Sequence, residues 1–201
     1  MVRKVNWLGL AAGMLTLVVL LVSLYVPWWQ LTIGQGLIRV NASPVYTKFG
    51  LLGTPFTIPI IWALNLITIL TFAVSGIVML IYSLVPTKPY AKHLLGFSWK
   101  KPLYSIIGFA VPLLIILLIA GHFGINLPLN SSSNVMLPRT MMPEGVTISA
   151  LVSGAFQLPF YLAIVAAALC VGARFYHPLV AKPSIVPAQT VTPATPAASN
   201  A

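Results

Sequence analysis

Side chains that could carry out acid–base or metal chemistry are few in this chain. Its 201 residues include one acidic residue, Glu144, three histidines and one cysteine. General acid–base and nucleophilic catalysis need such a group placed against a second one, and a metal ion needs several ligands. Glu144 lies in the turn-forming sequence MMPEGV, and Cys170 lies within an apolar segment. We therefore expect no catalytic site, no metal site and no cofactor.

The three histidines do not form a cluster in the sequence. His93 lies among lysines and His177 follows the last apolar segment, whereas His122 ends the third apolar segment in AGHFG. His122 is the only candidate ligand for a haem or copper ion, and a bis-histidine haem would need a second histidine at the same depth. A structural hydrogen-bonding role for His122 is the simpler interpretation.

Polar and small side chains recur at helical spacing within two apolar segments. One stripe lies in the second segment, and Gln157 precedes a run of small residues in the last one. Such faces let helices approach closely and hydrogen-bond to each other, but they can also line a polar path or a quinone-like pocket. Both interpretations stay open. The candidate ligand-binding residues are Asn65, Thr68, Thr71, Ser75, His122 and Gln157.

The composition indicates the environment in which these residues lie. Hydrophobic residues make up 59% of the chain, charged residues 6%, and the mean hydropathy is +0.98. A soluble domain carries about 25% charged residues. Residues 5–38, 49–87, 102–138 and 145–173 carry no charged side chain, and each segment is long enough for a membrane-crossing helix of about 20 residues. We predict helices at 6–26, 59–85, 103–122 and 150–173.

The positive charges predict the orientation in a cell membrane, since short cytoplasmic loops are enriched in Lys and Arg. With the N-terminus inside, eight of the eleven cations are cytoplasmic and three lie in the outer loops. The cytoplasmic set is Arg3, Lys4, Lys88, Lys92, Lys100, Lys101, Arg174 and Lys182, and the outer set is Arg39, Lys48 and Arg139. Both termini are therefore expected in the cytoplasm. The net charge of +10 is spread between apolar segments, which argues against a nucleic-acid partner.

The two outer loops, 27–58 and 123–149, are expected to form β-structure. The first contains WQLTI, LIRVN, PVYTKF and TPFTIP, which are rich in β-branched and aromatic residues and separated by glycines. The predicted fold is a membrane all-α four-helix bundle with a small extracytoplasmic antiparallel β cap formed by the two outer loops. This domain covers 1–177. Residues 178–201, rich in Pro, Ala and Thr, are predicted to be a disordered cytoplasmic tail.

Tryptophans and sequons fit the same orientation. Trp28 and Trp29 follow Pro27 where the first helix should reach the headgroup layer, a depth that favours indoles. The predicted interfacial anchors are Trp28, Trp29, Trp62 and Trp99. Asn130 and Asn41 begin sequons in the outer loops and are glycosylation candidates.

The layout resembles that of the claudin-like tetraspan proteins. It has one helix, a long β-rich outer loop, two helices joined inside, a shorter outer loop and a last helix. The family carries a tryptophan in the first outer loop, then Gly-Leu-Trp and two cysteines. This chain has Trp28 and Trp29 and then Gly50-Leu51-Leu52, without the cysteines. The resemblance implies a similar architecture, whereas paracellular or adhesive function does not carry over.

The sequence leaves three functions open. The leading prediction is a non-catalytic accessory or structural subunit of a larger membrane complex, or a self-associating envelope component. Its expected partners are membrane lipids and other membrane subunits or further copies of itself. One alternative is a carrier or channel for a neutral or lipid-like ligand, and another is a redox-complex subunit with haem or quinone near His122. The scarcity of acids suggests an acid- or heat-adapted, archaeal source.

Overall fold

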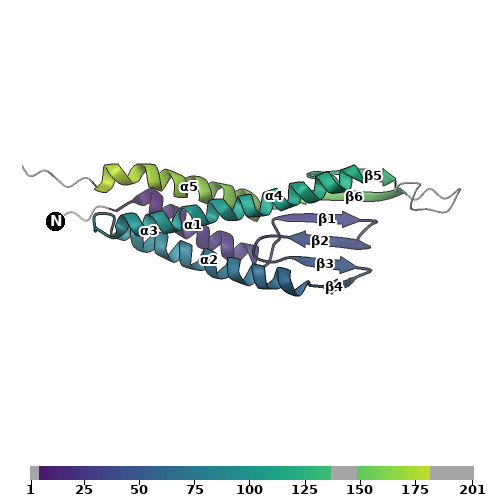
Figure 1. The fold of residues 1–201 in the computed structure, drawn as a ribbon, viewed down its shortest axis with the longest axis horizontal. Helices are drawn as coiled ribbons and strands as arrows, with labels where there is room; N and C mark the ends of the chain where they lie inside the picture. Colours follow the sequence, from purple (N-terminus) through teal and green to yellow (C-terminus); the bar gives the residue numbers. More distant parts are fainter. Residues whose placement is uncertain (1–4, 137–148, 182–201) are drawn as a thin grey trace, which may run out of the picture.

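The computed structural model describes residues 5–136 and 149–181 as an elongated molecule with helices along most of its length and one sheet at one end (Figure 1). The helices are α1 (Trp7–Ser23), α2 (Pro59–Leu84), α3 (Ala91–Ser98), α4 (Lys100–His122) and α5 (Leu158–Ala181). The strands are β1 (Trp29–Ile33), β2 (Ile38–Ala42), β3 (Lys48–Leu51), β4 (Thr54–Phe56), β5 (Ser131–Met136) and β6 (Ser149–Phe156).

Local sequence signals explain where the first two helices begin and end. The Asn6 side chain accepts a hydrogen bond from the Gly9 N–H and so caps α1. Pro59 occupies the first turn of α2, where its missing N–H costs nothing, and α2 ends shortly before Pro86. Both helices match the prediction closely. Among the described residues, Pro59–Leu84, Ala91–His122 and Leu158–Ala181 are long and apolar enough to cross a membrane, and α1 is a shorter apolar helix.

The segment between α2 and α4 is more helical than the sequence predicted. Residues 91–98 form α3, in a segment where no helix was predicted. Pro86 and Pro89 precede α3, and Pro102 falls in the first turn of α4, so no proline interrupts the helical hydrogen bonds of α3. α3 packs Ala91 and Leu95 against α1, α2 and α5. It is α3, and not α4, that completes the packing of helices at this end of the molecule.

The last predicted helix needs correction at both ends. Residues 150–156, expected to begin a helix, belong to β6, and α5 continues past Pro178 to Ala181. Residues 178–181 therefore belong to a helix, while the remainder of the predicted tail lies outside the described residues. β6 is a strand because its backbone pairs with β1 on one side and β5 on the other. The pairing with β1 depends on a segment far away in the sequence.

The predicted antiparallel sheet with strands from both loops is confirmed. Its six strands lie in the order β4-β3-β2-β1-β6-β5, and every neighbouring pair is antiparallel. The polar sequence NSSSN lies largely in β5. Asn41 lies within β2 and Asn130 directly before β5. The glycosylation of these two residues stays a prediction.

Gly154 of β6 lies so close to the carbonyl oxygen of Pro128 that a Cβ atom there would overlap it.

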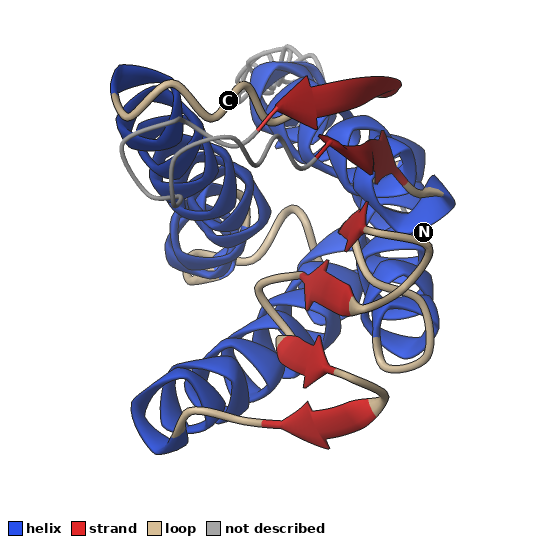
Figure 2. Ribbon diagram, turned by 90° about the vertical axis from the view of Figure 1, so that its right-hand side faces the viewer, coloured by secondary structure: helices blue, strands red, loops and turns tan. Residues whose placement is uncertain are grey.

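The sheet packs beside α4 and does not close over the ends of all the helices. Trp29, Leu31 and Val152 of the sheet form one hydrophobic cluster with Leu113 of α4. α4 accordingly extends along the strands beyond the other helices (Figure 1), and the view onto this end shows the strands in a row beside the helices (Figure 2). We call this end of the molecule the sheet end, and the opposite end, which carries Lys92 and Arg174, the basic end.

Trp28 lies at the junction of the helices and the sheet. Its ring contacts Phe72, Phe109 and Phe160 edge-on, with centroid distances of 6.4, 5.4 and 6.0 Å, and its Nε1 donates to the Ser23 hydroxyl at 2.8 Å. Trp29 is also buried and donates from Nε1 to the Leu129 carbonyl. This corrects the expectation that both indoles are interfacial anchors, because protein encloses them.

We predict that Trp28→Ala strongly destabilises the protein in detergent. Removing a large aromatic ring from a core typically lowers the free energy of unfolding by about 3–5 kcal/mol. The matched control is Trp7→Ala, since the Trp7 side chain is 70% exposed. Thermal unfolding followed by circular dichroism measures both. Equal effects of the two substitutions would contradict the assigned role of Trp28.

Candidate ligand-binding site

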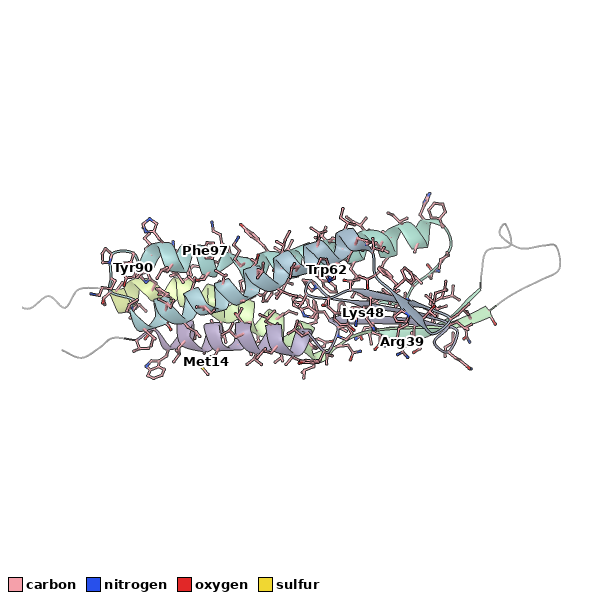
Figure 3. All side chains as sticks on the ribbon, turned by 90° about the horizontal axis from the view of Figure 1, so that it is seen from below. Met14, Arg39, Lys48, Trp62, Tyr90 and Phe97 are labelled. Atoms are coloured by element: carbon pink, nitrogen blue, oxygen red, sulfur yellow. The ribbon has the colours of Figure 1, made fainter. Side chains whose placement is uncertain are left out.

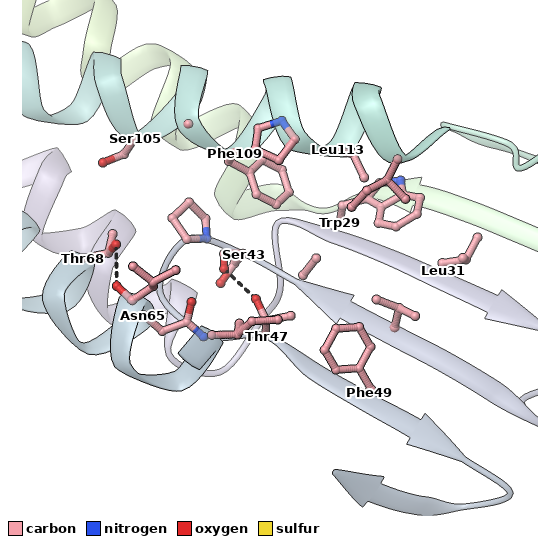
Figure 4. Close-up of a pocket in the computed structure, with 18 of the residues that line it drawn as sticks. Trp29, Leu31, Ser43, Thr47, Phe49, Asn65, Thr68, Ser105, Phe109 and Leu113 are labelled. Atoms are coloured by element: carbon pink, nitrogen blue, oxygen red, sulfur yellow. Dashed lines mark hydrogen bonds between the residues drawn. The ribbon is translucent and has the colours of Figure 1, made fainter. Parts of the chain in front are cut away.

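A cavity of about 670 Å³ lies between α2, α4 and the face of the sheet that is turned toward them (Figure 4). Its lining is mostly apolar, with a few hydroxyl groups, one amide and one ammonium group. The lining residues are Trp29, Leu31, Val40, Ala42, Ser43, Pro44, Thr47, Phe49, Ile61, Leu64, Asn65, Thr68, Thr71, Lys101, Tyr104, Ser105, Gly108, Phe109, Pro112, Leu113, Ile116, Leu117 and Leu127.

The lining residues follow the spacing of the helix or strand to which they belong. On α2 the lining positions follow helical spacing from Ile61 to Thr71, and on α4 they run in the same way from Lys101 to Leu117. On β2 the alternate residues Val40 and Ala42 face the cavity, as expected for side chains two positions apart on a strand. The two helices and the sheet thus contribute one face each.

Asn65 holds one wall of the cavity in place. We assign the Asn65 amide with its oxygen and nitrogen exchanged, because only this orientation satisfies both neighbours: Asn65 then accepts from the Thr47 N–H at 2.8 Å and donates to the Pro44 carbonyl at 3.2 Å. The Ser43 hydroxyl closes the same loop by accepting from the Tyr46 N–H at 2.9 Å. Asn65 is buried. Its amide therefore joins α2 to the loop between β2 and β3.

The two threonines of the predicted stripe also line the cavity. Thr68 Oγ1 donates to the Leu64 carbonyl at 3.0 Å, and Thr71 Oγ1 donates to the Ile67 carbonyl at 2.8 Å. Each hydroxyl proton is thus used within α2, while the oxygen lone pairs can accept a hydrogen bond from a ligand. Thr68 and Ser105 come from opposite walls of the cavity (Figure 4).

The other predicted ligand-binding residues lie elsewhere. Ser75 is buried and donates to the Ser98 carbonyl at 2.9 Å, which joins α2 to α3. His122 is exposed at the end of α4, beside the Phe123 ring. Gln157 precedes α5, and its backbone N–H donates to the Trp28 carbonyl at 2.9 Å. The structure therefore brings together Asn65, Thr68 and Thr71, but not the remaining three candidates.

Sequence reasoning missed the α4 wall and the position of Lys101. Because Ser75 bonds to Ser98, the junction of α3 and α4 lies beside the middle of α2, and Lys101 lines the cavity together with Thr71. Lys101 is the second residue of α4, so the charged start of this helix reaches the cavity. The cytoplasmic position expected for Lys101 stays a prediction.

The other tryptophans lie at the surface or near it. Trp62 on α2 is 59% exposed (Figure 3). Trp99 lies between α3 and α4 and is partly buried, with Lys100 Nζ 5.9 Å from the centre of its ring. The role of these two residues as interfacial anchors stays a prediction.

No protein-family model and no curated protein sequence matches the chain. Among residues 5–136 and 149–181, no three His, Cys, Asp or Glu side chains lie close enough together to hold a metal ion. The candidate site is therefore defined by the cavity and its lining alone.

We predict that Asn65→Ala destabilises the protein, whereas Thr68→Val has little effect. Truncating Asn65 leaves the Thr47 N–H and the Pro44 carbonyl, both on half-buried residues, without their partner, and a lost hydrogen bond typically costs about 0.5–1.5 kcal/mol. Thr68 bonds only within its own helix. Thermal unfolding in detergent distinguishes the two substitutions. Similar melting temperatures would show that Asn65 does not anchor the loop.

Proposed function

We propose that the protein is a non-catalytic membrane protein that binds a lipid-like molecule in the cavity between α2, α4 and the sheet. The cavity itself is the observation that supports this proposal. Its volume of about 670 Å³ falls within the range of roughly 300–1,000 Å³ that is typical of small-molecule sites. Among the three functions left open by the sequence, the carrier for a neutral or lipid-like ligand agrees best with a cavity of this kind.

The lining favours a ligand with one apolar chain and a small polar group. Leu31, Val40 and Phe49 from the sheet and Leu113 and Leu117 from α4 form apolar walls toward the sheet end. Thr68, Thr71, Lys101, Tyr104 and Ser105 line the other end, whereas Ser43, Thr47 and Asn65 lie at the loop between β2 and β3 and bond to that loop. Apolar walls with a few placed polar groups are the usual pattern of sites that orient an amphiphile.

The dimensions of the cavity favour a chain molecule over a helix of a partner protein. The lining runs from Ile61 to Thr71 on α2 and from Lys101 to Leu117 on α4, which are distances of about 15 Å and about 24 Å at about 1.5 Å per residue. A partner helix would need a groove of about 30 Å to cross the apolar layer.

Access to the cavity is sideways, between α2 and α4. Leu64 on α2 and Tyr104 and Ile116 on α4 line the cavity and are each more than half exposed. If these helices cross the bilayer, with both termini in the cytoplasm as the charges predict, the opening faces the lipid chains. A lipid-like ligand could then enter without passing through water.

The accessory-subunit function is the second candidate, and the exposure of α4 favours it. Only 6% of the apolar window in Ala91–His122 is buried, compared with 28% for α2 and 33% for α5. Because so little of this helix packs against the rest of the protein, it has a free face for another subunit or for a second copy of the protein. The two functions are compatible, since a subunit of a complex can also hold a lipid.

The test of ligand binding is Gly108→Trp. Gly108 lines the cavity, and an added Cβ atom there would meet no other atom within 4 Å. The indole should therefore fill the cavity without disrupting α4. We expect a loss of most of the lipid that copurifies with the protein in mild detergent, measured by mass spectrometry of an organic extract.

The control is Leu118→Trp, which places an indole on an exposed position of α4 outside the cavity. It should leave the retained lipid unchanged. Wild-type protein that retains no lipid-like molecule, or a Gly108→Trp variant that retains as much as wild type, would contradict the proposal.

A further inference from the structure

A second cavity, of about 580 Å³, lies at the basic end between α3, the start of α4 and α5. Its lining consists of Lys92, His93, Gly96, Trp99, Lys100 and Arg174. Three of these six residues carry a full positive charge. This cavity shares no lining residue with the one between α2 and α4.

The positive charges of the second cavity have no carboxylate partner in the part of the chain that the structure describes. The only acidic residue, Glu144, falls in the sequence between β5 and β6 and lies outside that part. Lys92, Lys100 and Arg174 therefore repel one another across the cavity. An anion from outside the chain would remove this repulsion and form charge-assisted hydrogen bonds with all three.

Packing places the cations around the cavity from two directions. Ala91, Leu95 and Ser98 form the buried side of α3, so Lys92 and Gly96 lie away from it, and Lys100 follows as the first residue of α4. Arg174 comes from α5, directly after Ala173, which packs against Ala91 and Leu95 in the same cluster. Gly96 has no side chain, and an added Cβ atom would meet open space. The cavity is therefore open between the two helices.

We propose that this cavity binds the phosphate headgroup of an anionic phospholipid. Basic pockets between membrane helices on the cytoplasmic side are suited to such headgroups, and an Arg guanidinium binds phosphate oxygens in a bidentate manner. The side chain of Trp99 lines the cavity together with the cations and offers an apolar surface to an attached lipid. The site is separate from the proposed ligand cavity and rests on the helices crossing a membrane with the basic end at the cytoplasmic headgroup layer.

Competition between lipids tests this proposal. Purified protein is equilibrated with mixed micelles of phosphatidylglycerol and phosphatidylcholine, and bound lipids are counted by native mass spectrometry. We expect wild type to prefer phosphatidylglycerol. The Lys92→Gln/Lys100→Gln variant should lose about tenfold or more in that preference, since each cation near an anionic lipid contributes a substantial attraction.

The matched control is Arg39→Gln/Lys48→Gln, which removes the same charge at the sheet end (Figure 3). It should keep the preference of wild type, as should Gly108→Trp. Equal losses in the two double variants would overturn the proposal, because they would indicate attraction by net charge alone.

Two further measurements distinguish a lipid headgroup in this cavity from a lipid bound elsewhere and from a free anion. Gly96→Leu keeps every charge but fills the cavity, so it should also lower the preference for phosphatidylglycerol; an unchanged preference would overturn the assignment to the cavity. Inorganic phosphate should stabilise wild type against heat less than phosphatidylglycerol does. Equal stabilisation by the free ion would contradict a lipid as the natural occupant.

Discussion

The enclosure of the Trp28 ring determines how the helices join the sheet. The indole is held by Phe72 of α2, Phe109 of α4 and Phe160 of α5, and by the Ser23 hydroxyl at the end of α1. Its backbone N–H donates to the Ala42 carbonyl, and its carbonyl accepts from Gln157. Trp28 thus contacts or hydrogen-bonds to all four long helices. Its backbone also bonds to the end of β2 and to the residue that follows β6. The orientation of the sheet relative to the helices follows from these contacts.

The candidate cavity is a consequence of that arrangement. At the basic end α3 occupies the position beside α2, and the bond from Ser75 to Ser98 keeps it there. Farther along, α4 packs against the sheet through Leu113. α4 therefore leaves α2 where α3 ends, and the space between them is covered by β1, β2 and β3. An ordinary closed bundle would have filled this space with side chains from both helices.

Much of the fold could be predicted from residues that are near one another in the sequence. The charge-free segments and the prolines at their ends indicated α1 and α2, and β-branched and aromatic residues between glycines indicated β1 to β4. The start of α5 could not be predicted in this way, because SALVSGAF is apolar and small and suits either structure; pairing with β1 decides that it is a strand. The burial of Trp28 likewise depends on three phenylalanines that are distant in the sequence.

The candidate site was predicted only on one wall. The spacing of Asn65, Thr68 and Thr71 identified a polar face of α2 that does line the cavity. The sequence could not indicate what lies opposite that face, because the register between α2 and α4 is set by the Ser75–Ser98 contact. Asn65 was predicted to bind a ligand, whereas in the structure its amide binds the backbone of the 43–47 loop.

The central claim is that a lipid-like molecule occupies the space between α2, α4 and the sheet. Its most direct test is photolabelling in membranes with a lipid that carries a photoreactive group on its chain, followed by peptide mass spectrometry. The account predicts labels concentrated on cavity residues such as Leu64, Phe109 and Leu113, and suppressed by an excess of unlabelled lipid. Labels spread equally over exposed residues outside the cavity, such as Leu118 and Val165, and insensitive to competition, would contradict it.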